Sequence, residues 1–226
     1  MSNRTIYDAL IAAHLTPEGA CGLMGNMMAE STMKSNIAQR GMTTMTDEQY
    51  TAAADNGTIN FTNDSVGYGL CQWTFNTRKA ALLAFARNKG VSVGDETMQV
   101  QFCLRELQQD YPMVFLLLCS SHDIDECADR VCDKYERPAV NNYPARRQFA
   151  REFFNEFCGS GALSQEHATL NQMETPKQES STIGKKIAVI FMQMIMHYCG
   201  YWGDATGEAN AEFISAAHTF VDDMAK

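Results

Sequence analysis

Apolar residues recur at helical spacing through most of the first 158 residues. Thr16, Pro17 and Glu18 form a helix start, with a hydroxyl cap, a proline at the first helical position and an acid in the first turn. Apolar residues then follow at helical spacing as far as Met28. The same periodicity predicts helices over residues 78–89, 95–109, 111–119, 124–135 and 144–158. We therefore predict a mainly α-helical domain over residues 1–158.

Residues 34–66 break this pattern. Thr, Asn, Asp and Gly dominate there, and apolar periodicity is weak. We expect a long loop or a short β-hairpin around Asn56, Gly57 and residues 59–61. Such a stretch inside a compact domain often forms one wall of a binding site.

Two segments follow the helical domain. Residues 159–182 are polar and lack periodicity, which predicts a linker. Residues 183–226 predict a helical hairpin, and about 44 residues bury too little surface to fold easily alone. We expect it to pack on the first domain or on a copy of itself. Its second arm carries an apolar stripe of Phe213, Ile214, Ala217, Phe220, Val221 and Met224.

Composition excludes several classes of function. The chain has 226 residues and a formal charge of −9, which argues against broad nucleic-acid binding and against adhesion to anionic membranes. Its longest apolar run, residues 187–202, is too short for a membrane span, and we find no secretory signal. The eight cysteines form no CxxC pair and have no histidine at ligand spacing, so we expect core thiols and no metal site.

Glu30 is the sharpest candidate for chemistry. It ends the first long predicted helix, directly after Met27, Met28 and Ala29. Apolar neighbours and the negative end of the helix dipole favour a carboxylic acid that keeps its proton. Glycosidic bond cleavage needs such an acid, because the leaving oxygen must receive a proton. The plainer interpretation is a helix-end glutamate that points into water.

A second motif, GYGLCQWT, occupies residues 67–74. Its two glycines allow a tight turn and the close approach of a ligand. The rings of Tyr68 and Trp73 can stack on a sugar face, and Gln72 can bridge hydroxyls or an acetamido group. The alternative is a tight turn around a buried tryptophan.

Four sequence elements in this order resemble the phage tail lysozyme family over about residues 14–155. They are GNMMAES at 25–31, GYGLCQWT at 67–74, Arg78 with its apolar helix, and YERPA at 135–139. The first two also look like motifs of goose-type lysozymes and lytic transglycosylases. The resemblance implies a lysozyme-like helical fold that cleaves the β-1,4 bond between N-acetylmuramic acid and N-acetylglucosamine. By that resemblance Glu30 matches the catalytic acid, and Ser31, Gln72 and Trp73 line the glycan groove.

Other polar residues near these motifs have less defined roles. We expect Tyr135 to contact substrate, whereas Glu136 should form a local ion-paired corner at a helix end. The arginines of the last helix, Arg146, Arg147 and Arg151, are expected to be solvated or paired with nearby glutamates.

The second carboxylate of the reaction is Asp64 or a neighbour. Asp64 lies three residues before the GYGL turn and could hold a water on the far face of the sugar. Asp64 as a loop-capping acid is the alternative, and Asp47, Glu48 and Asp55 compete for the role. If no carboxylate is suitably placed, the hydroxyl of muramic acid itself attacks, which is the reaction of a lytic transglycosylase.

We therefore expect a muramidase encoded by a phage or prophage, a glycoside hydrolase that needs no cofactor. Its partner is the glycan strand of peptidoglycan. Without a signal it is made in the host cytoplasm and acts as a released endolysin, which the short length favours, or as part of a phage tail. The hairpin would provide homo-oligomerisation or cell-wall docking. The rival hypothesis is a non-catalytic, glycan-binding structural component of the phage.

Overall fold

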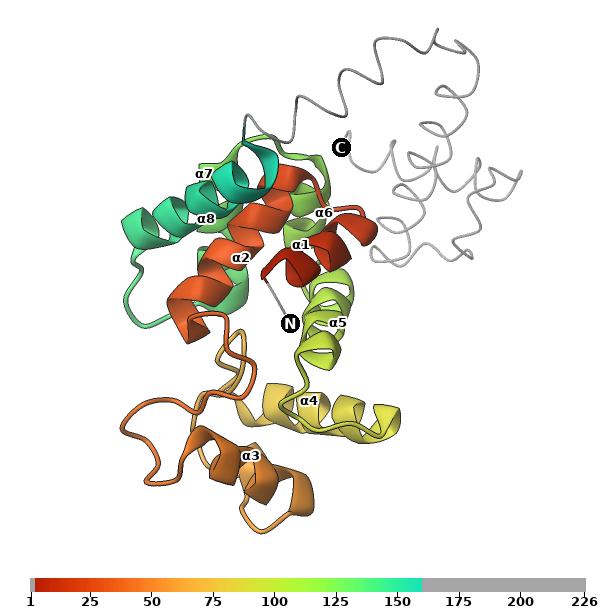
Figure 1. Cartoon of the computed structure of the whole chain (residues 1–226), viewed down its shortest axis with the longest axis vertical. Coiled ribbons are helices and arrows are strands. Elements are labelled where there is room, and N and C mark those ends of the chain that lie inside the picture. The colour runs from red at the N-terminus through yellow and green to blue at the C-terminus, as the bar shows by residue number, and fades with distance from the viewer. Residues whose placement is uncertain (1–2, 160–226) are drawn as a thin grey trace, which may run out of the picture. The chain divides into compact units, whose positions relative to one another are not determined.

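The computed structural model describes residues 3–159, and these residues are mainly helical (Figure 1). They contain no β-strand, only isolated bridges that join Tyr68 to Ala38 and to Trp73. The predicted fold class, a lysozyme-like helical domain, is thereby confirmed. The helices are α1 (Asn3–Ala12), α2 (Pro17–Ser31), α3 (Asp47–Asn56), α4 (Asn76–Lys89), α5 (Glu96–Gln109), α6 (Pro112–Ser120), α7 (Ile124–Arg130) and α8 (Tyr143–Cys158), with a 3₁₀ turn η1 (Phe61–Asn63) and a π-helix η2 (Val131–Glu136).

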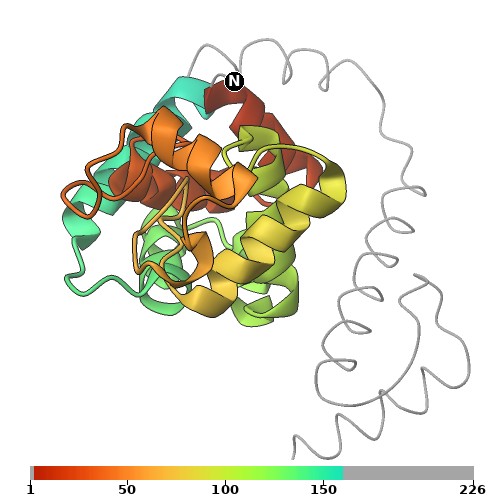
Figure 2. The same cartoon turned by 90° about the horizontal axis from the view of Figure 1, so that it is seen from below.

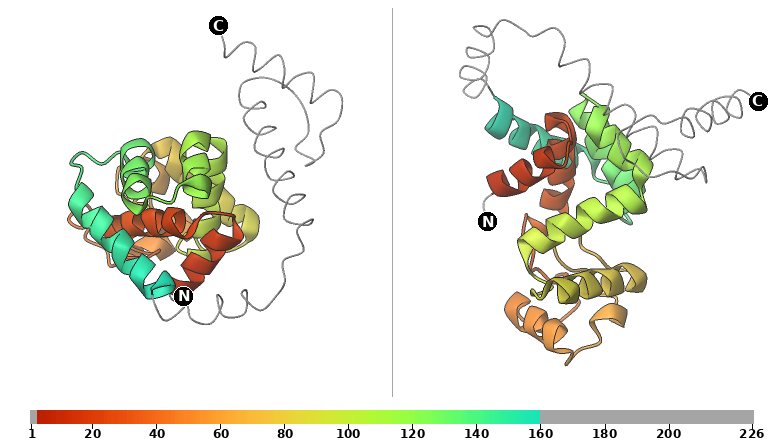
Figure 3. Two further views of the ribbon diagram at one scale, coloured as in Figure 1. Left: turned by 90° about the horizontal axis from the view of Figure 1, so that it is seen from above. Right: turned by 90° about the vertical axis from the view of Figure 1, so that its right-hand side faces the viewer.

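Helix α2 is the centre of one group of helices. It begins where the sequence predicts, because the Thr16 hydroxyl accepts a hydrogen bond of 2.9 Å from the Gly19 N–H and Pro17 is the first helical residue. Most of its side chains are buried. It packs chiefly against α8 and α7, with α6 and α1 completing the group (Figures 1 and 3).

Three glycines of α2 let neighbouring helices approach its backbone closely. A Cβ atom added at Gly19 would lie 2.0 Å from the Leu118 carbonyl oxygen of α6. At Gly22 it would lie 2.6 Å from Cβ of Cys127 in α7, and at Gly25 2.6 Å from the Arg146 carbonyl oxygen of α8. The glycines follow one another every three residues, so they share one side of the helix. This contact holds the C-terminal end of α2, which carries Glu30, directly beside α8.

Helices α3 and α4, with η1, form a second group, which is nearest the viewer in Figure 2. Helix α5 runs from this group to the first one, as the right-hand view of Figure 3 shows. Its buried Gln99 fastens two loops between the groups: the side-chain oxygen accepts from the Leu70 N–H, and the side-chain nitrogen donates to the Ser35 carbonyl. The loops that carry Ser35 and Leu70 are thus anchored to α5.

The segment predicted as a loop or β-hairpin is different in the structure. It contains α3, which starts at a capping box in which Thr46 and Gln49 bond each other's backbone N–H. Gly57 adopts a left-handed conformation with φ of 77° and ends this helix instead of turning a hairpin. The hairpin prediction was therefore wrong, because a glycine that follows Asn is equally suited to a helix C-terminus.

The region predicted as one helix over 124–135 has two parts. Helix α7 ends at Arg130, and the chain continues as the π-helix η2 as far as Glu136. Arg137 then takes a left-handed conformation with φ of 50°, and its N–H donates to the Cys132 carbonyl over 2.8 Å. The π-helical turn and the left-handed Arg137 together set the backbone position of Glu136.

Some predictions fall on residues that the structure does not describe, and others concern a membrane span, a metal site and the state of the cysteines. The predicted linker beyond Gly159 and the predicted hairpin over 183–226 lie outside them. Within residues 3–159, no helix is long and apolar enough to cross a membrane, and no three potential ligands gather for a metal ion. The seven cysteines in this range form no disulfide, and five of them are buried.

Candidate active site

A pocket of about 580 Å³ lies at the C-terminal end of α2. It is lined by the last turn of α2, the loop over residues 37–40, the turn over 71–75, the first turns of α4 and the segment that follows η2. Four distant stretches of sequence therefore meet there, since the turn over 71–75 leads directly into α4. The lining residues are Glu30, Ile37, Ala38, Gln39, Arg40, Cys71, Gln72, Thr74, Phe75, Arg78, Glu136, Arg137, Pro138 and Ala139.

Glu30 is paired with an arginine of α8. Nη2 of Arg146 donates to Oε1 of Glu30 over 2.5 Å, and Nη1 donates to the Asn26 side-chain oxygen over 2.9 Å. Arg146 is only 4% exposed, so the expectation of a solvated arginine strip fails at this residue. The helix-end carboxyl therefore has a buried cationic partner and does not simply point into water.

Arg147 and Arg151 differ from Arg146. Both are paired with aspartates of α7, Arg147 with Asp129 and Arg151 with Asp125. They were expected to be solvated or to pair with glutamates of their own helix, and both are partly exposed. The carboxylate partners lie instead on the neighbouring helix, which sequence spacing could not indicate.

Gln72 is held at the wall of the pocket by its own turn and by the loop over residues 37–40. Its side-chain nitrogen donates to the carbonyls of Gly69 and Ile37, over 3.1 Å and 3.4 Å. Its backbone is left-handed, with φ of 44°. Thr32, just after Glu30, and Arg137, just after Glu136, are also left-handed. Such strain in residues other than glycine costs free energy and gathers where function needs a fixed geometry.

Glu136 brings a second carboxyl into the pocket. Its Oε1 is buried and has no hydrogen-bond partner among the described residues. Burial and the nearby Glu30 carboxylate raise the pKa of Glu136 well above its usual value, although Arg78 and Arg146 act in the opposite direction. The expected ion-paired corner is absent, because no arginine or lysine within residues 3–159 forms a salt bridge with it. Glu136 is thus a carboxyl that favours its protonated form.

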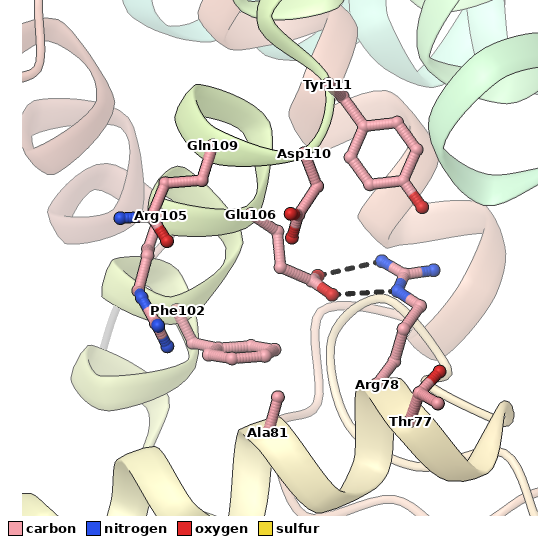
Figure 4. A pocket seen from close by; sticks show the side chains of 9 residues that line it. All are labelled: Thr77, Arg78, Ala81, Phe102, Arg105, Glu106, Gln109, Asp110 and Tyr111. Atoms are coloured by element: carbon pink, nitrogen blue, oxygen red, sulfur yellow. Dashed lines mark hydrogen bonds and ion pairs between the residues drawn. The ribbon is translucent and has the colours of Figure 1, made fainter.

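Glu106, on α5, is the centre of a hydrogen-bond network beside the site. Arg78 binds it in a bidentate ion pair, with two bonds of 2.8 Å (Figure 4). Its Oε2 also accepts hydrogen bonds of 2.7 Å from the Trp73 indole and from the Tyr135 hydroxyl. Figure 4 shows the Arg78–Glu106 pair in a second pocket of about 380 Å³, which both residues line. Arg78 lines both pockets and so connects the network to Glu30 and Glu136.

Four predicted substrate contacts are buried residues. Tyr68, Trp73 and Tyr135 are 0% exposed and Ser31 is 1% exposed. Tyr68 bonds Thr51, and the Ser31 hydroxyl donates to the Met27 carbonyl. Their rings and hydroxyls therefore support the walls of the site and do not face a ligand. Gly69 likewise makes room for the Gln99 side chain, 2.5 Å from an added Cβ, and not for a sugar.

Asp64 lies away from the pocket, in a buried ion pair. Its Oδ1 accepts from Lys79 over 2.5 Å and its Oδ2 from the Tyr50 hydroxyl over 2.5 Å. Lys79 is fully buried and has no other carboxylate partner among the described residues. Oδ1 of Asp64 also accepts from the Val66 N–H over 3.0 Å, which is the loop-capping contact that the sequence analysis gave as the alternative. Asp47, Glu48 and Asp55 do not line the pocket either.

Sequence reasoning missed two features of the pocket rim. Phe75 directly follows the GYGLCQWT motif and is 60% exposed. The Arg137 guanidinium lies 5.9 Å from the centre of its ring. The position of Phe75 next to the motif was the available signal. For Arg137, the signal was its presence in the YERPA element itself.

The two carboxyls, the exposed ring and the motifs that surround them all fall within one matched region. A family model described as phage tail lysozyme matches residues 2–157. The chain belongs to the phage tail lysozyme family. The resemblance predicted from the four sequence elements is thus confirmed. Membership fits the helical, lysozyme-like fold of residues 3–159.

The chain is also similar to Morphogenesis protein 1 of Bacillus phage B103. The two chains are 28% identical over 174 residues, which are 72% of this chain and 42% of the relative. The match therefore spans less than half the length of that relative.

Proposed function

We propose that the chain is a muramidase that hydrolyses the β-1,4 bond between N-acetylmuramic acid and N-acetylglucosamine, with Glu30 as a catalytic carboxylate. The observation that carries this proposal is the position of Glu30. It stands at the end of the central helix, in a pocket of about 580 Å³ that it shares with Glu136. Pockets of this size accommodate small ligands or sugar units.

The rim of the pocket suits a glycan with acidic substituents. Phe75 offers an exposed ring on which the apolar face of a sugar can stack. The amide of Gln72 matches acetamido groups in hydrogen-bonding capacity. Arg40, Arg78 and Arg137 line the same pocket, whereas the chain as a whole carries a charge of −9. A local concentration of arginine favours the lactyl and peptide carboxylates of peptidoglycan.

We further propose that the enzyme acts as part of the phage particle and not as a released endolysin. The family is described as that of tail lysozymes, and the name of the B103 relative is that of a morphogenesis protein. Both support a delivery route through the particle. This replaces our preference for an endolysin, which rested on chain length.

Replacement of Glu30 by Gln tests the catalytic assignment. We expect E30Q to lose about 10²–10⁴-fold of the activity on purified cell walls, the usual contribution of a catalytic acid or base. Glu156→Gln, on the exposed face of α8, is the matched control and should clear walls at the parent rate. A turbidity assay measures both. An E30Q variant that clears walls as fast as the parent would show the assignment to be wrong.

Analysis of the products separates the alternatives. Hydrolysis yields muramic acid with a free reducing end, and a lytic transglycosylase yields a 1,6-anhydro product, which mass spectrometry distinguishes. A folded parent chain that binds glycan strands and releases neither product would support the non-catalytic structural role.

A further inference from the structure

We infer that the second pocket of the domain, which Figure 4 shows, binds the peptide stem that branches from the glycan strand held at Glu30. The first pocket then takes the sugars and the second takes the branch. This inference rests on the proposed function and deepens it, because it names the form of glycan that the site selects.

The first support is that the two pockets meet at one residue. Arg78, on α4, lines both of them. Its Nε and Nη2 each bind Glu106 over 2.8 Å, whereas Nη1 has one long contact of 3.5 Å, with the Tyr135 carbonyl. The guanidinium therefore keeps N–H groups that a ligand carbonyl can accept. A ligand that fills both pockets passes over Arg78.

The second support is the charge left unpaired in the second pocket. Arg105 and Asp110 both line it and both are exposed, and within residues 3–159 neither side chain forms a hydrogen bond or an ion pair. Figure 4 shows the Arg105 guanidinium on the side of the pocket opposite Arg78, with Asp110 between them. Arg78 and Glu106 neutralise each other, so one positive and one negative charge remain.

These two charges match a peptide better than a sugar. The stem is joined to the lactyl group of muramic acid, and it carries free carboxylates together with the side-chain amine of a diamino acid. A carboxylate of the stem can pair with Arg105, and the amine can pair with Asp110. A strand of N-acetylated sugars offers no cationic group to Asp110.

The third support is the lack of an exposed ring in the second pocket. Phe102 is only 1% exposed, and the half-buried Tyr111 packs edge-on against Tyr135 with ring centres 5.1 Å apart. The exposed ring of Phe75 lines the first pocket and not the second. The volume of about 380 Å³ is near the lower end of the usual range for ligand pockets, about 300–1,000 Å³, and suits a short peptide.

A pair of substrates tests this inference. One is soluble glycan strands that carry their stems, and the other is the same strands after an N-acetylmuramoyl-L-alanine amidase has removed the stems. On stem-bearing strands, Arg105→Gln and Asp110→Asn should each raise KM about 3–10-fold with kcat unchanged, because an exposed charge-assisted contact to the substrate is lost. On stripped strands both variants should match the parent.

The matched control is Arg87→Gln, which removes an exposed arginine at the end of α4 that lines neither pocket. It should match the parent on both substrates.

The outcomes separate this inference from the proposed function. Parent-like KM values of Arg105→Gln and Asp110→Asn on stem-bearing strands would overturn the stem site. Equal increases on both substrates would overturn it in favour of a further sugar subsite. A parent chain inactive on both substrates would overturn the muramidase itself.

A binding measurement tests the stem site without catalysis. The free tetrapeptide L-Ala–γ-D-Glu–meso-diaminopimelate–D-Ala, and its counterpart with lysine, are titrated into the labelled parent and into E30Q. Backbone amide resonances over residues 105–111 should shift with at least one peptide in both proteins, and Arg105→Gln should weaken the response. Spectra of the parent in which neither peptide moves these resonances contradict the inference, whether or not the chain cleaves glycan.

Discussion

Glu30 and Glu136 illustrate how surroundings, and not residue type, decide what a carboxyl can do. Both line one pocket, yet one has a buried arginine as partner and the other has an enclosed oxygen with none. The sequence placed Glu30 correctly at a helix end. It could not reveal the partner, because Arg146 lies 116 residues further along the chain.

The buried carboxyl of Glu136 should make stability fall as pH rises. Its pKa is raised in the folded state, so its contribution is complete below the unfolded pKa of about 4.3 and is lost as pH rises through the folded value. Replacement by Gln removes this titration. We expect calorimetry between about pH 5 and pH 8 to show a smaller decline in Tm for E136Q than for the parent.

The matched control for this experiment is again Glu156→Gln, whose side chain is exposed. It should follow the parent profile. A parent Tm that declines no more than that of E136Q over this range would contradict a protonated Glu136.

Among the elements, the close packing of α2 against its neighbours depends on glycines, which place no side chain at the contacts. Gly22→Ala places a Cβ 2.6 Å from Cβ of Cys127 and 3.0 Å from the Ala128 nitrogen, so α7 must move. Although alanine favours helices, we expect this variant to lose about 1–3 kcal/mol of unfolding free energy through overpacking. Urea denaturation measures the change.

Asn88→Ala, at an exposed position of α4, provides the comparison. It should change the unfolding free energy by no more than about 0.5 kcal/mol. A Gly22→Ala variant as stable as Asn88→Ala would show that α7 can move away from α2 at little cost.

Periodicity predicted the long helices well, because one face of each is buried against the core. It missed α3, of which only Tyr50, Ala53 and Ala54 are buried. The capping box of Thr46 and Gln49 was the signal that could have revealed it. A helix that buries only a few side chains has too few apolar positions to give a clear periodic pattern.

The site was predicted in part. Glu30 and Gln72 line the pocket as expected, whereas Tyr68, Trp73 and Tyr135 are buried within its walls. Nothing in the local sequence tells a stacking ring from a supporting one. The difference depends on Glu106 and Thr51, whose positions relative to these rings are set by the tertiary fold.

On the scale of the molecule, residues 3–159 enclose a continuous core. Buried residues from α1 to α8 belong to one cluster, which runs from Ile6 to Phe157. We therefore expect a chain that ends at Gly159 to fold and to hydrolyse soluble glycan fragments at the parent rate. Circular dichroism and product analysis would check this. An unfolded truncation would show that residues beyond Gly159 complete the core, and the predicted division into domain, linker and hairpin would be withdrawn.

The bond between Trp73 and Glu106 gives such a truncated chain a built-in optical probe. The full sequence has two tryptophans, and Trp73 is the one that remains. Its indole is fully buried and donates to the carboxylate that also holds Arg78 at the pocket. The emission wavelength of this single tryptophan therefore reports the polarity around that carboxylate, and a glycan that shifts Arg78 or Glu106 would change it without any label.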